Sequence, residues 1–245
     1  MSEPALLLLH GLGANAHVWD GLIRLLRQRD PERVVVAPDL PGHAGGPRLA
    51  HYSFGEVAAA VAEPLDRSLR YAVLGHSFGG VVALTLATGW FGLDITEVTA
   101  VGVKVAWSEQ DGARAAALAV KPHAWFETHA AAAERFAKVA GLWDVVPTDH
   151  PAIGAGVEPV DGGWRTTVDP ATTGGGAPDM VGLLAAARAP VRLARGELDP
   201  MCTAEDLVEL AAQTGMPPHL TLAGVGHNPH VEAPEAVLEL VRSGE

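Results

Sequence analysis

The chain has 245 residues, of which 48% are hydrophobic and 19% are charged, and its net charge is −12. This composition supplies a large apolar core and excludes a disordered chain, and the length is typical of one domain with room for an inserted segment. The acidic excess would repel phosphate groups and anionic lipids, so we expect neither nucleic acid nor a membrane as a partner. A small neutral or weakly charged substrate fits this charge better.

Cysteine usage and local hydropathy bear on the compartment. Cys202 is the single cysteine, which excludes an intramolecular disulfide and a Cys-based structural zinc site. This is typical of a reducing compartment, and we expect a cytoplasmic protein. The apolar run 5–9 is too short to span a membrane and no basic segment precedes it, so we expect neither a signal peptide nor an anchor. The sequence leaves the oligomeric state open.

Short apolar runs alternate with helical patterns along most of the chain. The helical patterns occupy residues 19–29, 54–65, 78–88, 180–188, 205–213 and 234–242. The apolar runs occupy residues 5–9, 34–37, 71–74, 98–105, 191–194 and 220–222. Continuous leucine and β-branched runs separated by helices predict a parallel sheet that is buried on both faces. The predicted fold class is therefore α/β.

The rhythm is interrupted between Trp107 and about Met180. This stretch contains alanine-rich helical patterns at 112–120 and 130–140 and glycine-rich turns, with little that resembles a buried parallel strand. We predict a core of residues 1–106 and 181–245 with a helical insertion over residues 107–180.

A serine lies between a predicted strand and a predicted helix, in the run Gly75-His76-Ser77-Phe78-Gly79. In this context a sharp strand-to-helix turn exposes the serine hydroxyl at the edge of the sheet. The turn strains the backbone at Ser77, and side chains at Gly75 and Gly79 would collide with the neighbouring strand or helix. The helix N-terminus also favours an anionic intermediate. We therefore interpret Ser77 as a nucleophile rather than as an ordinary helix N-cap.

Two later strand ends supply an acid and a base for that serine. Asp199 follows the strand 191–194, and His227 follows the strand 220–222. The carboxyl ends of parallel strands lie on one edge of a sheet, so we expect Asp199 and His227 to approach Ser77. A serine hydroxyl attacks only when a base accepts its proton and a partner holds that base in position.

The chain resembles the α/β-hydrolase superfamily everywhere except in residues 107–180. The matching motifs are His10-Gly11-Leu12-Gly13, Asp39-Leu40-Pro41-Gly42-His43, the serine turn, Gly196-Glu197-Leu198-Asp199 and Gly226-His227-Asn228-Pro229. The resemblance implies that Ser77 is the nucleophile, His227 the base and Asp199 the orienting acid. It also implies that the backbone N–H groups of Leu12 and Phe78 form the oxyanion hole, and that no cofactor is needed.

One feature departs from the family pattern. The first predicted strand begins within a few residues of Met1, whereas family members usually carry a β-hairpin before it. The resemblance therefore implies a sheet of about six strands, flanked by helices, without that hairpin. It also implies that the insertion 107–180 caps the active site.

Other residues compete for these roles. Glu197 is an alternative acid and His230 an alternative base. The position of Asp199 and the Gly-rich context of His227 favour Asp199 as the acid and His227 as the base. A metal site from His227 and His230 lacks carboxylate or cysteine support, so we expect no metal. We expect His10, His43 and His76 to pack turns, and Cys202 to be a buried thiol.

A second motif points to a different class of protein. The run 11–16 (Gly-x-Gly-x-x-Ala) follows a strand, and Asp39 ends the next one, which matches a dinucleotide-binding pattern. An NAD-dependent oxidoreductase remains a weaker alternative, because it leaves Ser77, Asp199 and His227 unexplained.

The predicted function is hydrolysis of a carboxylic ester or a related acyl bond, such as a thioester or lactone. The same three residues also serve C–C bond hydrolysis, elimination and acyl transfer in the family, and a non-turnover small-molecule receptor is a further alternative. We expect Trp107, Trp125 and Asn228 to line the substrate pocket. The apolar character of the two tryptophans suggests a small, partly apolar substrate. A polar group in the cap, aimed at a substrate carboxylate or ketone, would separate these reactions. Candidates for that group are Arg114, Lys121, Arg135 and Arg165.

Overall fold

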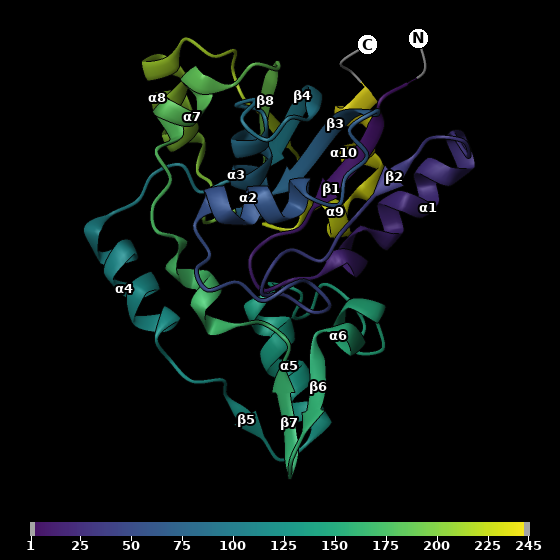
Figure 1. Ribbon diagram of the computed structural model, residues 1–245, viewed down its shortest axis with the longest axis vertical. Coiled ribbons are helices and arrows are strands. Elements are labelled where there is room, and N and C mark those ends of the chain that lie inside the picture. Colours follow the sequence, from purple (N-terminus) through teal and green to yellow (C-terminus); the bar gives the residue numbers. More distant parts are fainter. Residues whose placement is uncertain (1–2, 243–245) are drawn as a thin grey trace.

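A six-stranded parallel sheet forms the centre of the molecule in the computed structural model, which describes residues 3–242 (Figure 1). The strand order is β2-β1-β3-β4-β8-β9. The strands are β1 (Ala5–Leu9), β2 (Val35–Val36), β3 (Arg70–His76), β4 (Asp94–Val101), β8 (Val191–Gly196) and β9 (Leu220–Leu222). Every neighbouring pair is parallel, which confirms the predicted α/β class and strand number.

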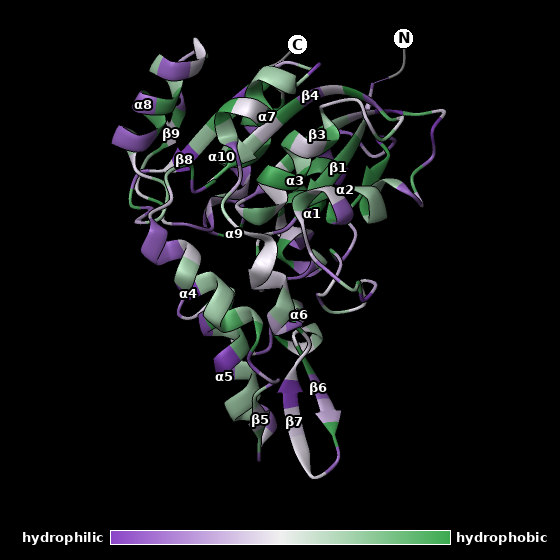
Figure 2. Cartoon of the chain, turned by 60° about the vertical axis from the view of Figure 1, so that its left-hand side comes forward, coloured by the Kyte–Doolittle hydropathy of each residue, from purple (hydrophilic) through white to green (hydrophobic). Residues whose placement is uncertain are grey.

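The leucine run of β1 explains why the sheet is covered on both sides. Leu7 and Leu9 pack in one apolar cluster, and Leu6 and Leu8 pack in a second one. Successive strand side chains point to opposite faces, so a strand made entirely of apolar residues needs helices on both faces. Figure 2 shows the hydrophobic strands β1 and β3 enclosed between helices.

Helices supply the cover for each face. The first cluster includes α2 (Phe54–Ala62), α3 (Phe78–Leu86), α7 (Met180–Ala186) and α8 (Ala204–Thr214). The second includes α1 (Asp20–Arg29) and α10 (Pro234–Arg242), with the short helices η1 (Ala16–Trp19) and α9 (Pro229–Glu232) beside them. Between residues 3 and 242, no helix is long and apolar enough to cross a bilayer.

The segment between β4 and α7 extends away from the sheet (Figure 1). Its helices are α4 (Glu109–Ala119), α5 (His129–Val139), α6 (Pro151–Ala155) and the 3₁₀ helix η2 (Pro170–Gly175). It also contains an antiparallel sheet in the order β5-β7-β6, formed by β5 (Trp125–Phe126), β6 (Val157–Val160) and β7 (Gly163–Thr166). The insertion therefore combines helices with a small sheet, whereas the sequence pattern predicts helices alone.

The hydropathy pattern misses the hairpin of β6 and β7, but the turn between these strands has a sequence signal. These strands have four residues each and alternate only weakly, so periodicity carries little signal. The two residues between them are Asp161 and Gly162, and Gly162 has φ of 79°. Asp-Gly is a strong signal for a two-residue hairpin turn, and it marks this hairpin in the sequence.

Two buried histidines fix the loops after β1 and β2. His10 Nε2 accepts the N–H of Leu40 (2.9 Å), and its Nδ1 donates to Gly11 O (2.9 Å). His43 Nε2 accepts the N–H of Gly13 (3.0 Å), and its Nδ1 donates to Pro41 O (3.0 Å). A neutral imidazole has one donor and one acceptor, so both rings are fully used in holding backbone.

The turn from β3 into α3 passes against the end of β1. Ser77 has φ of 49° and ψ of −115°, a strained conformation for a residue with a side chain. A Cβ on Gly79 would overlap the carbonyl groups of Leu9 and His10, and one on Gly75 would overlap the backbone of Gly79. The close approach of these backbones therefore requires both glycines.

Gly79→Ala tests this constraint. The added methyl group meets backbone, which cannot move aside as a side chain can, so we expect a loss of at least about 2 kcal/mol in the free energy of unfolding. Urea denaturation measures it. Gly112→Ala is the matched control, because Gly112 lies inside α4 with open space around it, and alanine there should stabilise slightly. If the two variants change the free energy of unfolding equally, the backbone does not crowd Gly79 as described.

Burial of neutral histidines should also make stability depend on pH. Desolvation lowers the pKa of His10 to about 4 and those of His43 and His230 to about 3. Between these values and 6.5 the unfolded chain binds more protons than the folded one. The free energy of unfolding therefore falls as the pH is lowered, by up to about 1.4 kcal/mol per pH unit for each histidine.

Urea unfolding at several pH values between 7.5 and about 5 measures this slope. His43→Gln removes one titrating ring and should reduce the slope by about one proton. A slope that His43→Gln leaves unchanged would show that His43 does not contribute to the pH dependence.

Candidate active site

The site lies at the carboxyl edge of the sheet, where the loops after several strands converge. The register places Leu9 opposite Gly75, Gly75 opposite Ala100, and Val101 opposite Ala194. The ends of β1, β3, β4 and β8 are therefore level. Residues directly after these strands come together although they are far apart in the sequence.

Asp199 and His227 are joined directly. His227 Nδ1 lies 2.9 Å from Asp199 Oδ2, and the Asp199 side chain is fully buried. The other carboxylate oxygen, Oδ1, accepts the N–H groups of Met201 (2.8 Å) and Cys202 (3.3 Å). Both oxygens are thus engaged, which fixes the carboxylate and the ring that it orients.

The backbone around His227 is held from two sides. The Glu232 carboxylate accepts the N–H of Gly226 (2.7 Å) and the N–H of Asn228 (3.0 Å), which flank His227. On the other side, His76 Nε2 donates to His227 O (2.7 Å). Desolvation lowers the pKa of His76 well below its usual range, so this ring is neutral.

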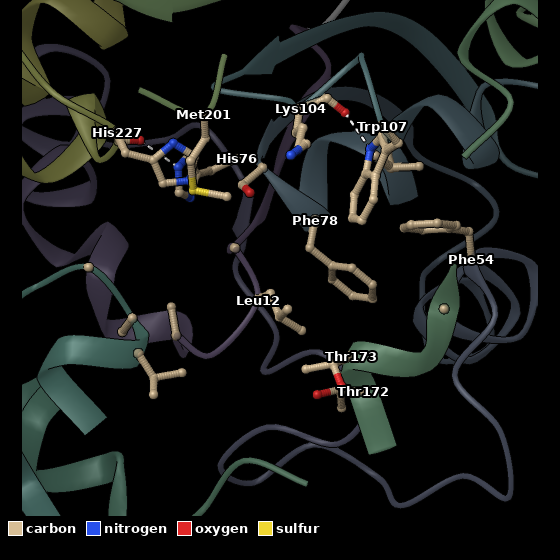
Figure 3. A pocket seen from close by; sticks show the side chains of 18 of the residues that line it. Leu12, Phe54, His76, Phe78, Lys104, Trp107, Thr172, Thr173, Met201 and His227 are labelled. Atoms are coloured by element: carbon tan, nitrogen blue, oxygen red, sulfur yellow. Dashed lines mark hydrogen bonds between the residues drawn. The ribbon is translucent and has the colours of Figure 1, made fainter. Parts of the chain in front are cut away.

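Ser77 and His227 both line a cavity of about 190 Å³ (Figure 3). Its apolar lining is formed mainly by Leu12, Phe54, Phe78, Trp107, Val139 and Met201. Between residues 3 and 242, no hydrogen bond joins the Ser77 hydroxyl to His227. Hydrogen bonds of this kind are often long in free enzymes and tighten only when substrate is bound.

Two backbone N–H groups of residues that line the cavity with Ser77 have no acceptor among the described residues. Phe78 begins α3, so its N–H has no intrahelical partner. In the loop after β1, the N–H groups of Gly13 and Ala14 are bonded to His43 and Gly11, whereas the described residues supply no acceptor for that of Leu12. Leu12 and Phe78 both line the cavity.

The alternative acid and base are engaged elsewhere. Glu197 accepts the N–H of Gly224 (2.8 Å) and does not contact His227. His230 is buried between the rings of Trp19 (centroids 4.4 Å apart) and His76 (4.4 Å), outside the cavity.

The structure separates the three residues that the sequence analysis assigns to the pocket. Trp107 lines the cavity, and its Nε1 donates to Lys104 O (3.0 Å). Trp125 lies instead in β5, paired with Arg165 and 52% exposed, because the small sheet carries it away from the core. Asn228 is buried outside the cavity lining and donates to Gly141 O (2.9 Å), which ties the loop after His227 to the insertion.

The dinucleotide alternative receives no support from the geometry. Asp39, which would bind a ribose in that interpretation, is bonded to the N–H groups of Ala16 (2.8 Å) and Gly45 (3.1 Å). Across the described part of the chain, no three His, Cys, Asp or Glu side chains form a group that could hold a metal ion. Burial raises the pKa of the Cys202 thiol to about 12, so it is not a reactive thiolate.

Sequence analysis missed several lining residues. Lys104 follows β4 at the carboxyl edge, a position that could have drawn attention to it, whereas Thr172 and Thr173 lie in η2 and carry no motif. None of the cations considered from the sequence lines the cavity. Arg165, for example, pairs with Glu158 within the small sheet.

Comparison with known proteins gives partial matches at the sequence level. The chain is 40% identical over 115 residues to the magnesium-chelatase 30 kDa subunit of Rhodobacter capsulatus, a match that covers 44% of this chain and 37% of that protein. It is 38% identical over 84 residues to the pimeloyl-[acyl-carrier protein] methyl ester esterase of Methylococcus capsulatus, covering 34% and 31% respectively. The matches thus span about a third of the length of these curated relatives.

The fold likeness extends over the whole chain. The crystal structure of E-2-(acetamidomethylene)succinate hydrolase superposes with a TM-score of 0.81 at 24% identity, covering 99% of this chain and 91% of that one. The model of the alpha/beta hydrolase family matches residues 6–240. The chain therefore belongs to the alpha/beta hydrolase family.

Proposed function

We propose that the protein is a serine hydrolase that cleaves a carboxylic ester or a related acyl bond, such as a thioester or lactone. Ser77 attacks the substrate carbonyl, and His227 accepts the serine proton and then donates it to the leaving group. Asp199 holds the imidazole, and the N–H groups of Leu12 and Phe78 bind the developing oxyanion. Water then hydrolyses the acyl-enzyme by the same steps.

The observation that supports this proposal best is the convergence of separate chain segments on one cavity. A serine in a strained strand-to-helix turn and a histidine bonded to a buried carboxylate line the same apolar space. No structural requirement of the sheet places a strained serine and a paired histidine there. The esterase named among the relatives belongs to the same chemical class.

Substrate access depends on the insertion, which we propose acts as a cap. Its residues Trp107, Val139 and Thr173 line the cavity together with residues of the core loops. Because the lining is mostly apolar and the volume is about 190 Å³, the acyl group that fits is small and partly apolar.

Fluorophosphonate labelling tests the nucleophile directly, because the probe reacts with an activated serine whichever substrate the enzyme prefers. Wild-type protein should react at Ser77, located by mass spectrometry of the modified peptide, and Ser77→Ala should not react. Ester turnover should fall by about three orders of magnitude or more in Ser77→Ala, with little change in Tm. A folded wild type that resists labelling, or a Ser77→Ala variant that keeps its activity, would overturn the proposal.

Glu232→Gln tests the positioning of His227. The two N–H groups bond different oxygens of Glu232, and an amide replaces one of these oxygens with an NH2 donor. The loop should therefore shift, and a small displacement of a catalytic group lowers the rate. We expect kcat and the rate of Ser77 labelling to fall about tenfold, with less change in KM. Glu235→Gln is the control, because Glu235 is an exposed glutamate on α10. Equal rates for the two variants would show that Glu232 does not position His227.

A further inference from the structure

The cavity contains one charged residue whose role the hydrolysis steps do not use. Among the described residues that line it, Lys104 is the single lysine, arginine, aspartate or glutamate. Lys104 lies three residues after β4, and its side chain is 26% exposed. In Figure 3 its ammonium group faces the cavity that Phe78 and Trp107 also border.

Contacts from the insertion hold Lys104 in place. Its Nζ lies 5.4 Å from the centroid of the Trp107 ring, and Trp107 Nε1 donates to its backbone oxygen. Its ion-pair partner is Asp111, at 2.9 Å. Trp107 thus orders both the main chain and the cation, which reduces the entropy lost when the ammonium binds a further group.

Asp111 does not saturate this cation. An ammonium has three donors, and the contact to Asp111 uses one of them. The Asp111 carboxylate, in the first turn of α4, also accepts the N–H (3.0 Å) and the hydroxyl (2.8 Å) of the N-cap residue Ser108. The backbone bond from Ser108, the hydrogen bond from Lys104 and the Ser108 hydroxyl together lower its pKa to about 2. Asp111 therefore stays charged and hydrogen-bonded if Lys104 turns toward a ligand.

Filling the cavity changes the surroundings of Lys104. A neutral, apolar ligand would remove water from the ammonium without offering it a new hydrogen-bond acceptor, and this desolvation costs binding free energy. A ligand that carries a carboxylate at that point would replace the lost water with a charge-assisted hydrogen bond. A carboxylate at that point should therefore favour an anionic ligand over a neutral one of equal length.

We propose that Lys104 binds a free carboxylate of the substrate, so that the preferred substrates are small esters that carry a carboxylate away from the scissile bond. This inference rests on the proposed function and names its substrate class. Within that function Lys104 is a specificity-determining residue, and it takes no part in proton transfer at Ser77.

Matched ester pairs test the proposal. Monomethyl esters of linear dicarboxylic acids are compared with methyl esters of monocarboxylic acids of the same chain length, over a short series of lengths. Wild-type protein should have a higher kcat/KM for the anionic member of a pair. In Lys104→Met, which keeps the length of the side chain and removes its charge, the anionic-to-neutral ratio should fall by about ten- to a hundredfold, mainly through KM.

Two further variants separate recognition from support of the insertion. Asp111→Asn breaks the ion pair and leaves the cation, so its ratio should equal or exceed that of the wild type. Lys138→Met is the matched control, because Lys138 also pairs with a carboxylate (Glu134) and lies 4.8 Å from the Trp143 ring, but does not line the cavity. Its ratio should match that of the wild type.

The outcomes distinguish this inference from the proposed function. If wild-type protein shows no preference at any chain length, or if Lys104→Met leaves the ratio unchanged, the inference is wrong. Labelling of Ser77 by fluorophosphonate, measured on the same samples, reports the proposed function independently. If Lys104→Met does not fold, a ratio that falls in Asp111→Asn overturns the inference and a ratio that is kept or rises supports it.

Discussion

The close crossing of the β3–α3 turn over the end of β1 is the constraint on which the rest of the site depends. Gly79 lies so near the carbonyl groups of Leu9 and His10 that no side chain fits between them. The same crossing brings the loop after β1 against the turn, with Gly11 beside the ring of His76. The strained conformation of Ser77 is therefore held by backbone packing against Gly79 on one side and by the contact between Gly11 and the His76 ring on the other.

Neutral histidines hold the loops at this edge of the sheet in place. His10 and His43 accept N–H groups of Leu40 and Gly13, which a protonated ring could not do because both its nitrogens are donors. Desolvation keeps these rings neutral by lowering their pKa values. The apolar core thus determines the protonation state that the loops need, and that dependence couples the stability of the fold to pH.

The sequence predicts the core of this molecule better than the insertion, for a physical reason. Strands buried on both faces must be continuously apolar, so β1, β3 and β4 stand out from the helices around them. Spacing along the chain also places Asp199 and His227 after neighbouring strands, and the structure joins them by a hydrogen bond. In the insertion, short half-exposed strands and alanine-rich helices give no such signal. Which side chains reach the cavity there depends on packing, as the contrast between Trp107 and Trp125 shows.

Charge illustrates the difference between a global and a local property. A net charge of −12 predicts weak attraction for anions when it is averaged over the surface, and on that basis a neutral substrate is expected. Within the cavity, however, the single charged residue among the described lining is a cation, Lys104, whose side chain is partly exposed and pairs with Asp111 outside the lining. Electrostatic interactions strengthen as water is removed and weaken with distance through it. On the proposal made for Lys104, the sign of the charge inside the cavity therefore outweighs the acidic exterior in deciding which ligand binds there.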